Sequence, residues 1–242
     1  SFQGRYAVVR QTRMGNHSFQ QVVGFKNLEE LTDKLYNFSY RVTKKQALDL
    51  PDKIYTTRDV PLTSDQIKHY NMIKDTAVAF LDGGDLVSAP EVMTRLLRLQ
   101  QLLCGYLVTD DGETVEIANH RIDTMLETIN EMNGKVIIWS RFRYDIKKIR
   151  KTLEKAYGSG SVVTYFGDTS QEDREKAIDR FQNDTETRFF VGNAQTAGRG
   201  ITLTAATNVI YYSNDFNLET RIQSEDRCHR IGQKNKVLYV DL

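Results

Sequence analysis

The sequence is poor in cysteine, in long apolar runs and in net charge, and each shortage bears on the class of protein and its partners. Only two cysteines occur among its 242 residues, Cys104 and Cys228, so we expect a reduced, intracellular protein with two free thiols. No apolar run approaches the roughly 20 residues of a membrane span, and the first residues lack a signal peptide's apolar core, so we expect no membrane partner. The formal net charge of +1 argues neither for nor against nucleic acid.

The sequence also lacks an initiator methionine and the phosphate-binding loop that holds ATP in many enzymes. We expect Ser1 to follow an internal or processed boundary. The motif G-x-x-x-x-G-K-[ST] occurs nowhere in the chain, and the glycine-rich stretch "GNAQTAGRGITLTAA" (192–206) has neither its lysine nor its hydroxyl. Glycines in that stretch allow either a tight turn or a close approach of backbone N–H groups to a phosphate, and the pattern leaves both open.

The overall composition is that of a globular protein, with 40% hydrophobic and 27% charged residues. The length suffices for one large domain or two unequal ones. Positive charge is concentrated between Lys135 and Lys155, where eight basic residues accompany only two acidic ones, Asp145 and Glu154. Charge alone does not decide whether this segment is a solvated helix face or a binding surface.

The second half of the chain alternates strand-like and helix-like patterns. Short apolar runs predict strands at residues 135–140, 161–167, 188–193, 208–214 and 236–242. Ile146, Ile149 and Leu153 form one stripe of an expected helix, and Ser170 with Asp173 resembles a helix N-cap. We therefore expect an α/β fold with a mostly parallel sheet flanked by helices, in which ligands lie beyond the carboxyl ends of the strands.

The first half has a different organisation. Residues 60–105 have a mainly helical pattern, and residues 106–118, which contain "TDDGET", predict an excursion or hairpin. Residues 1–58 mix patterns and carry no clear assignment.

The stretch "DRCHRIGQ" (226–233) carries the most distinctive chemistry, and it allows three interpretations: a metal site, a solvated charge run or a paired grip on phosphate. Cys228 and His229 are adjacent and point in different directions, so they cannot share a metal in the usual spacing, and we expect no metal site. On an expected helix over 218–231, Gln223, Arg227 and Arg230 have the spacing i, i+4, i+7 and share one face. That shared face favours the grip on phosphate.

Four segments in a fixed order resemble motifs of a known family. They are "KVIIWSRF", "VTYFGDTSQEDREKAIDRFQND", "FFVGNAQTAGRGITLTAATNVIYYSNDFN" and "RIQSEDRCHRIGQ". The first resembles helicase motif IV, the second the segment that follows it, the third motif V and the fourth motif VI. Together they resemble the C-terminal RecA-like lobe of the Swi/Snf family of superfamily 2 helicases and DNA translocases.

The resemblance extends upstream and has local departures. "LYNFSYRVTKKQALDLPDKIYTTRDVPLTSDQIKHY" resembles the family's passage between its two lobes, with its "LP-x-K" and "LT-x-x-Q…Y" elements. In motif V, Ala197, Gly198 and Thr202 stand where the family usually has two glycines and an asparagine, and residues 216–218 are Phe-Asn-Leu instead of Trp-Asn-Pro. The arginines of motif VI follow the family pattern.

The resemblance implies a RecA-like lobe of the P-loop NTPase type and a division into three parts. Residues 1–58 would be the tail of the first helicase lobe and the connector, residues 59–118 a helical protrusion with its excursion, and residues 119–242 the C-terminal lobe with motifs IV, V and VI. The first lobe, which in the family carries the ATP-binding loop, would be a partner from the same polypeptide.

The implied function is that of the second motor lobe of an ATP-dependent double-stranded DNA translocase. ATP with Mg²⁺ would be bound mainly by the first lobe, and Arg227 and Arg230 would reach it as arginine fingers, with Gln223 beside them and Gly200 close to the nucleotide. Without the first lobe this chain would be an inactive part of an enzyme. A strand-separating helicase and a non-catalytic nucleic-acid-binding module are the alternatives.

Duplex DNA is the other partner that the resemblance implies. The loops that would contact its sugar-phosphate backbone contribute Ser140, Arg141, Arg143, Thr169, Ser170, Thr196, Gly198, Arg199 and Asn217. Such contacts position a motor and read no sequence. A monomer is expected, in the cytoplasm of a prokaryotic or phage-infected cell or in a eukaryotic nucleus.

Overall fold

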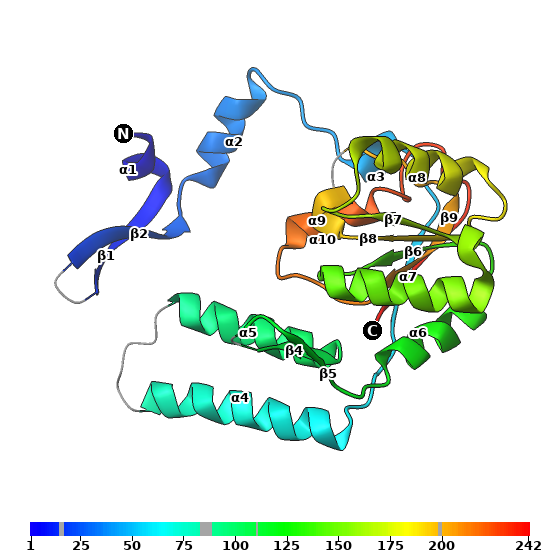
Figure 1. Cartoon of the computed structure of the whole chain (residues 1–242). Coiled ribbons are helices and arrows are strands. Elements are labelled where there is room, and N and C mark those ends of the chain that lie inside the picture. The colour runs from blue at the N-terminus through cyan, green and yellow to red at the C-terminus, as the bar shows by residue number, and fades with distance from the viewer. Residues whose placement is uncertain (15–16, 83–88, 110, 198–199) are drawn as a thin grey trace. The chain divides into compact units, whose positions relative to one another are not determined.

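The computed structural model describes residues 1–14, 17–82, 89–109, 111–197 and 200–242. It divides the chain into two compact units, Ser1–Asp49 and Leu50–Leu242. Figure 1 shows the elements of both units in chain order. None of the described helices is long and apolar enough to cross a membrane.

The first unit consists of a β-hairpin and short helices. The sequence patterns had assigned no secondary structure to these residues. Strands β1 (Ala7–Met14) and β2 (His17–Phe25) pair antiparallel. The helices are α1 (Phe2–Tyr6), α2 (Leu28–Tyr36) and α3 (Lys44–Ala47). Glu30 on α2 forms ion pairs with Arg5 at 2.7 Å and with Lys34 at 2.5 Å, which joins α1 to α2.

The second unit is built on a six-stranded parallel sheet. Its strands, from edge to edge, are β3 (Lys53–Thr57), β10 (Val237–Asp241), β9 (Ala206–Tyr211), β6 (Lys135–Trp139), β8 (Phe189–Gly192) and β7 (Val162–Tyr165). Every pair of neighbouring strands is parallel. The prediction of a mostly parallel sheet is confirmed. Four of the strands beyond residue 119 lie within the predicted apolar runs, and the fifth, β9, begins two residues before its run.

Helices cover both faces of this sheet. In Figure 1, α6 (Arg121–Asn130) and α7 (Arg143–Tyr157) lie on one side, and α8 (Gln171–Asn183) lies on the other. Successive strand residues point to opposite faces, so Val136 and Ile138 pack with the α6–α7 side whereas Ile137 and Trp139 pack with the α8 side. Because both faces of these strands are buried, their sequences are continuous apolar runs that do not alternate between apolar and polar residues.

The helix spacing predicted for α7 is confirmed. Ile146, Ile149 and Leu153 are fully buried against the sheet, and Gly158 follows the helix with a positive φ of 94°. Ser170 caps α8, because its Oγ accepts a hydrogen bond from the backbone N–H of Asp173 at 3.1 Å.

Residues 59–118, which we expected to form a helical protrusion, contain α4 (Ser64–Asp82), α5 (Ala89–Leu103) and a hairpin of β4 (Tyr106–Val108) and β5 (Thr114–Glu116). Figure 1 shows α4 and α5 side by side. Buried Gln66 joins them through its Nε2, which donates to the carbonyl oxygen of Leu102 at 2.9 Å. The predicted hairpin within residues 106–118 is present.

The segment that we expected to precede the lobe contributes to its sheet. Lys53–Thr57 forms β3 and pairs with β10, and the second compact unit accordingly begins at Leu50. Hydrophobic periodicity did not indicate this strand, because its residues lie at a sheet edge and most of them are exposed. β3 belongs to the sheet because it pairs with β10, whose residues lie far along the chain.

The helix expected over 218–231 is shorter than predicted. Helix α10 (Leu218–Glu225) ends before both arginines of the motif. A longer helix would need the carbonyl oxygen of Arg227 to accept from a residue four positions later. That oxygen instead accepts the backbone N–H of Leu203 at 2.8 Å, so the chain turns after α10.

Candidate functional site

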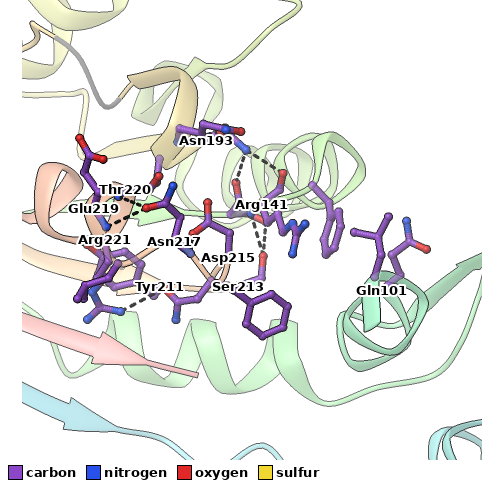
Figure 2. A pocket seen from close by; sticks show the side chains of 18 of the residues that line it. Gln101, Arg141, Asn193, Tyr211, Ser213, Asp215, Asn217, Glu219, Thr220 and Arg221 are labelled. Atoms are coloured by element: carbon purple, nitrogen blue, oxygen red, sulfur yellow. Dashed lines mark hydrogen bonds between the residues drawn. The ribbon is translucent and has the colours of Figure 1, made fainter. Parts of the chain in front are cut away.

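Three strand ends are joined at the carboxyl edge of the sheet. The side-chain amide of Asn193, which follows β8, donates to the carbonyl oxygens of Ser140 at 3.3 Å and Arg141 at 2.8 Å. The backbone N–H of Arg141, which follows β6, donates to Oγ of Ser213, which follows β9, at 2.9 Å. Figure 2 shows these contacts around Arg141. The loops after β6, β8 and β9 therefore hold one another in place.

A pocket of about 740 Å³ opens beside these loops. Its polar lining comes mainly from the carboxyl edge and from the start of α10, and Met93, Leu97 and Gln101 of α5 line its other side. Arg141 and Asn217, two of the residues predicted to bind DNA, face this pocket (Figure 2). The structure thus brings the loop after β6 and the start of α10 to one cavity.

Arg141 has further partners within the protein. Its Nη1 donates to Oε1 of Gln100 on α5, and its guanidinium lies 5.6 Å from the centre of the Phe142 ring. The side chain stays half-exposed. The contact with Gln100 links α5 to the carboxyl edge and holds the guanidinium beside the pocket.

Ser140 is oriented differently from the expectation. Its side chain is 1% exposed, and its hydroxyl lies 3.2 Å from Oδ2 of buried Asp145 and 3.0 Å from Oγ of Ser213. Ser140 supports the loop and presents no free hydroxyl to a ligand. Burial raises the pKa of Asp145 to about 7, despite the hydrogen bond from Ser140.

A second group of predicted residues surrounds the end of β7. Arg143 is 68% exposed and forms an ion pair with Asp168 at 2.7 Å. Thr169 Oγ1 accepts from the backbone N–H of Phe166 at 3.2 Å, and Ser170 caps α8. Both hydroxyl groups therefore shape the loop after β7, while Arg143 lies exposed beside it.

The remaining residues predicted to contact DNA have local roles at helix starts. The backbone N–H of Thr196 donates to Oδ1 of Asn193 at 3.1 Å. Oδ1 of Asn217 accepts from the backbone N–H groups of Glu219 at 2.9 Å and Thr220 at 3.2 Å, which caps α10. The predicted residues Gly198 and Arg199 lie outside the described residues.

Arg227 and Arg230 converge on one backbone atom. Their Nη1 atoms donate to the carbonyl oxygen of Ile201, at 3.4 Å from Arg227 and at 3.2 Å from Arg230. Partial burial, followed by repulsion from Arg230, lowers the pKa of Arg227 from its ordinary value. Ile201 follows Gly200, whose φ of 79° favours glycine, so this end of the glycine-rich loop contacts the arginine pair.

Gln223 lies near these arginines through its backbone only. Its carbonyl oxygen accepts from Nε of Arg227 at 2.9 Å, whereas its side-chain amide donates to Glu219 at 2.7 Å. The predicted shared face therefore holds for the two arginines and not for the glutamine side chain. The reason is the end of α10 at Glu225, after which the helical spacing no longer applies.

Several residues that organise the site were missed from the sequence. Asn193 and Ser213 lie at strand ends, where the rule for parallel sheets could have indicated them. No local sequence pattern indicates the contacts of Glu225 with Lys53 and Tyr55 of β3, because these contacts span about 170 residues of sequence.

Cys228 packs in the core. Its thiol is fully buried, lies 3.4 Å from the hydroxyl of Tyr239 and has its pKa raised to about 11 by burial. In the part of the chain that the structure describes, no group of three His, Cys, Asp or Glu side chains could hold a metal ion.

Comparisons with known proteins agree with this architecture. The helicase conserved C-terminal domain matches residues 119–232. The chain is 27% identical over 223 residues to the putative ATP-dependent helicase/translocase YwqA of Bacillus subtilis, across 88% of this chain and 24% of that protein. It therefore spans about a quarter of the length of that relative.

Solved structures show the same fold. The Sulfolobus solfataricus SWI2/SNF2 ATPase core in complex with double-stranded DNA superposes with a TM-score of 0.63 at 29% identity, over 88% of this chain and 46% of that one. The C-terminal part of the Fun30 ATPase domain reaches a TM-score of 0.65 at 19% identity, over 80% of this chain and 86% of that one.

The parallel sheet, its flanking helices and the matched domain define this protein as a RecA-like C-terminal helicase lobe. Its relatives in sequence and structure support a C-terminal lobe of the Swi2/Snf2 family of superfamily 2.

Proposed function

We propose that this lobe is the second half of an ATP-dependent motor that moves along double-stranded DNA. It supplies Arg227 and Arg230 to ATP held by a first lobe, and it contacts the sugar-phosphate backbone through the loops at its carboxyl edge. The names of its relatives, which include an ATP-dependent helicase/translocase and an ATPase core bound to double-stranded DNA, support this proposal.

The arginine pair is the observation that carries the proposal. Two guanidinium groups share one acceptor, the Ile201 carbonyl oxygen, and both side chains stay half-exposed. Arg230 forms no ion pair with a carboxylate among the described residues, so its guanidinium retains donors for an anion. Planar guanidinium groups match phosphate oxygens, and they stay charged despite the lowered pKa of Arg227.

This donor set fits the terminal phosphate of a nucleotide. Negative charge spreads over the phosphoryl oxygens during transfer, and preorganised guanidinium groups stabilise it without rearrangement. The described part of this lobe provides no cluster of carboxylates for Mg²⁺, and we assign that ion and the bulk of ATP to the first lobe. This chain then contributes the charge that completes the catalytic site.

The DNA contacts follow from the same edge of the sheet. Arg141 and Asn217 face the pocket, and Arg143 is exposed beside the next loop. These groups suit phosphate and sugar, and such contacts give affinity that depends on salt and tolerates any sequence. Ser140, whose hydroxyl is used internally, positions the loop in this scheme.

The remaining parts take the places that the family resemblance implies. Residues 1–58 belong to the tail of the first lobe and the connector, whose last part forms β3, and α4, α5 and the β4–β5 hairpin form a protrusion. The contact of Gln100 with Arg141 supports this, because it links the protrusion to the DNA-facing loop.

The deciding experiment is an ATPase assay on the complete polypeptide with and without duplex DNA. We expect duplex DNA to raise turnover and Arg230→Lys to remove most of it, with duplex affinity unchanged. Unchanged turnover in Arg230→Lys would refute the proposal. Strand separation on a forked duplex would indicate a strand-separating helicase, and binding without any turnover would indicate a non-catalytic module.

A further inference from the structure

Glu225, the last residue of α10, is held by donors from the distant strand β3 and from its own helix. Its carboxylate accepts from Nζ of Lys53 at 2.8 Å, from the hydroxyl of Tyr55 at 2.7 Å and from Nε of Arg221 at 2.9 Å. The Glu225 side chain is only 8% exposed. Lys53 and Tyr55 belong to β3, whereas Arg221 belongs to α10 itself.

The electrostatics indicate that this carboxylate is ionised. Burial alone would raise the pKa of Glu225, but the hydrogen bonds from Lys53, Arg221 and Tyr55 outweigh burial and lower the pKa below its ordinary value. Removing one partner would leave the others with an unbalanced, half-buried charge, which is costly.

Glu225 also anchors the turn that carries the arginines. Its backbone carbonyl oxygen accepts from the backbone N–H of His229 at 3.1 Å and from the hydroxyl of Tyr239 at 3.1 Å. Arg227 lies between Glu225 and His229. Both the side chain and the carbonyl group of Glu225 therefore fix the start of this turn.

His229 makes a second link to the segment before β3. Its Nε2 donates to the carbonyl oxygen of Pro51 at 2.7 Å. Glu225 and His229 flank Arg227 in sequence, and both bind residues between Pro51 and Tyr55. The chain enters this segment directly from Asp49 and Leu50, so the arginine turn is tied to the connector on both sides of Arg227.

We infer that Glu225 is a positioning residue for Arg227 and Arg230, and that the connector residues Lys53 and Tyr55 act through it to hold the arginine turn in its productive geometry. The inference rests on the proposed function, because it needs the arginines to act on ATP. It assigns a part in hydrolysis to a segment outside the helicase motifs.

The test uses the complete polypeptide and two conservative variants. Glu225→Gln neutralises the carboxylate with little change of shape. Tyr55→Phe removes one hydroxyl and keeps the ring that stacks on Tyr239 at 5.2 Å between centres. The matched control is Lys236→Met, because Lys236 also binds the connector, through an exposed ion pair with Asp52 at 3.1 Å that does not involve Glu225.

We expect kcat for DNA-stimulated ATP hydrolysis to fall between about tenfold and 10²-fold in Glu225→Gln, and less in Tyr55→Phe, because a misplaced catalytic group costs rate. The KM for ATP and the affinity for duplex DNA should stay unchanged. The double variant should be no slower than Glu225→Gln alone, since both changes act on the same hydrogen-bond network. Lys236→Met should retain full activity.

Two other outcomes would separate a failure of this inference from a failure of the proposed function. Turnover is normalised to the fraction of protein that binds duplex DNA, so partial unfolding cannot imitate a positioning defect. A wild-type kcat in Glu225→Gln, or an equal loss in Lys236→Met, would overturn the inference while leaving the proposed function intact. Unchanged turnover in Arg230→Lys would overturn the proposed function, and this inference with it.

Discussion

Arg227 and Arg230 donate hydrogen bonds to the same carbonyl oxygen, that of Ile201. Two like charges held this close repel each other, and their proximity contributes to the lowered pKa of Arg227. A bound anion would relieve that repulsion. The hydrogen bonds to Ile201 hold the two guanidinium groups close together, and the arrangement suits a transient, negatively charged ligand.

Replacing Arg230 by Lys should lower the rate of ATP hydrolysis by the complete polypeptide by roughly 10³-fold or more, which is the usual contribution of an arginine finger. A lysine keeps the charge but loses the planar, forked geometry. Steady-state ATPase assays with saturating duplex DNA measure the effect. Arg150→Lys on the exposed face of α7 is the control and should keep wild-type turnover.

Replacing Arg141 by Met should reduce the salt dependence of duplex binding. Each phosphate contact contributes about 0.9 to the slope of log affinity against log salt concentration, so the slope should fall by about that amount. Binding titrations at several salt concentrations give the slope. The control is Lys155→Met, which removes an exposed charge from the last turn of α7. An equal change in both variants would argue against a contact at the carboxyl edge.

Asp145 should make the lobe less stable as the pH rises from about 4 to about 7. Its carboxyl group has a pKa of about 7 in the folded state because it is buried, and an ordinary pKa in the unfolded chain. The unfolded state thus ionises first, and each pH unit in this window costs the folded state up to ~1.4 kcal/mol.

Asp145→Asn removes this titration, and its stability relative to the wild type should increase across that window and level off above pH 8. Urea unfolding at a series of pH values measures the difference. A constant difference from pH 4 to pH 8 would show that Asp145 does not titrate in this way.

Replacing Gly192 by Ala should destabilise the lobe by about 1–3 kcal/mol, the usual cost of overpacking a core. A Cβ atom at Gly192 would lie 2.8 Å from the carbonyl oxygen of Tyr165 and 3.2 Å from the Trp139 ring. Thermal unfolding measures the change. At Gly160 an added Cβ would meet nothing within 4 Å, so Gly160→Ala should be close to neutral.

Sequence patterns predicted the layered part of the fold because those patterns are local. The apolar runs of β6 and β8 report burial on both faces, and the spacing of Ile146, Ile149 and Leu153 reports the buried face of α7. The arginines of motif VI and the lack of a phosphate-binding loop also followed from the sequence, since both depend on residue types at short spacing.

Only the tertiary structure decided which contacts complete the site. β3 joined the sheet through pairing with β10, and α10 ended at Glu225, after which the backbone N–H of Arg227 donates to Ser224 and the carbonyl oxygen of Arg227 accepts from Leu203. The partners of Glu225 on β3 lie about 170 residues away in sequence. Local periodicity carries no information about such contacts, because they form only when the order of strands in the sheet brings distant segments together.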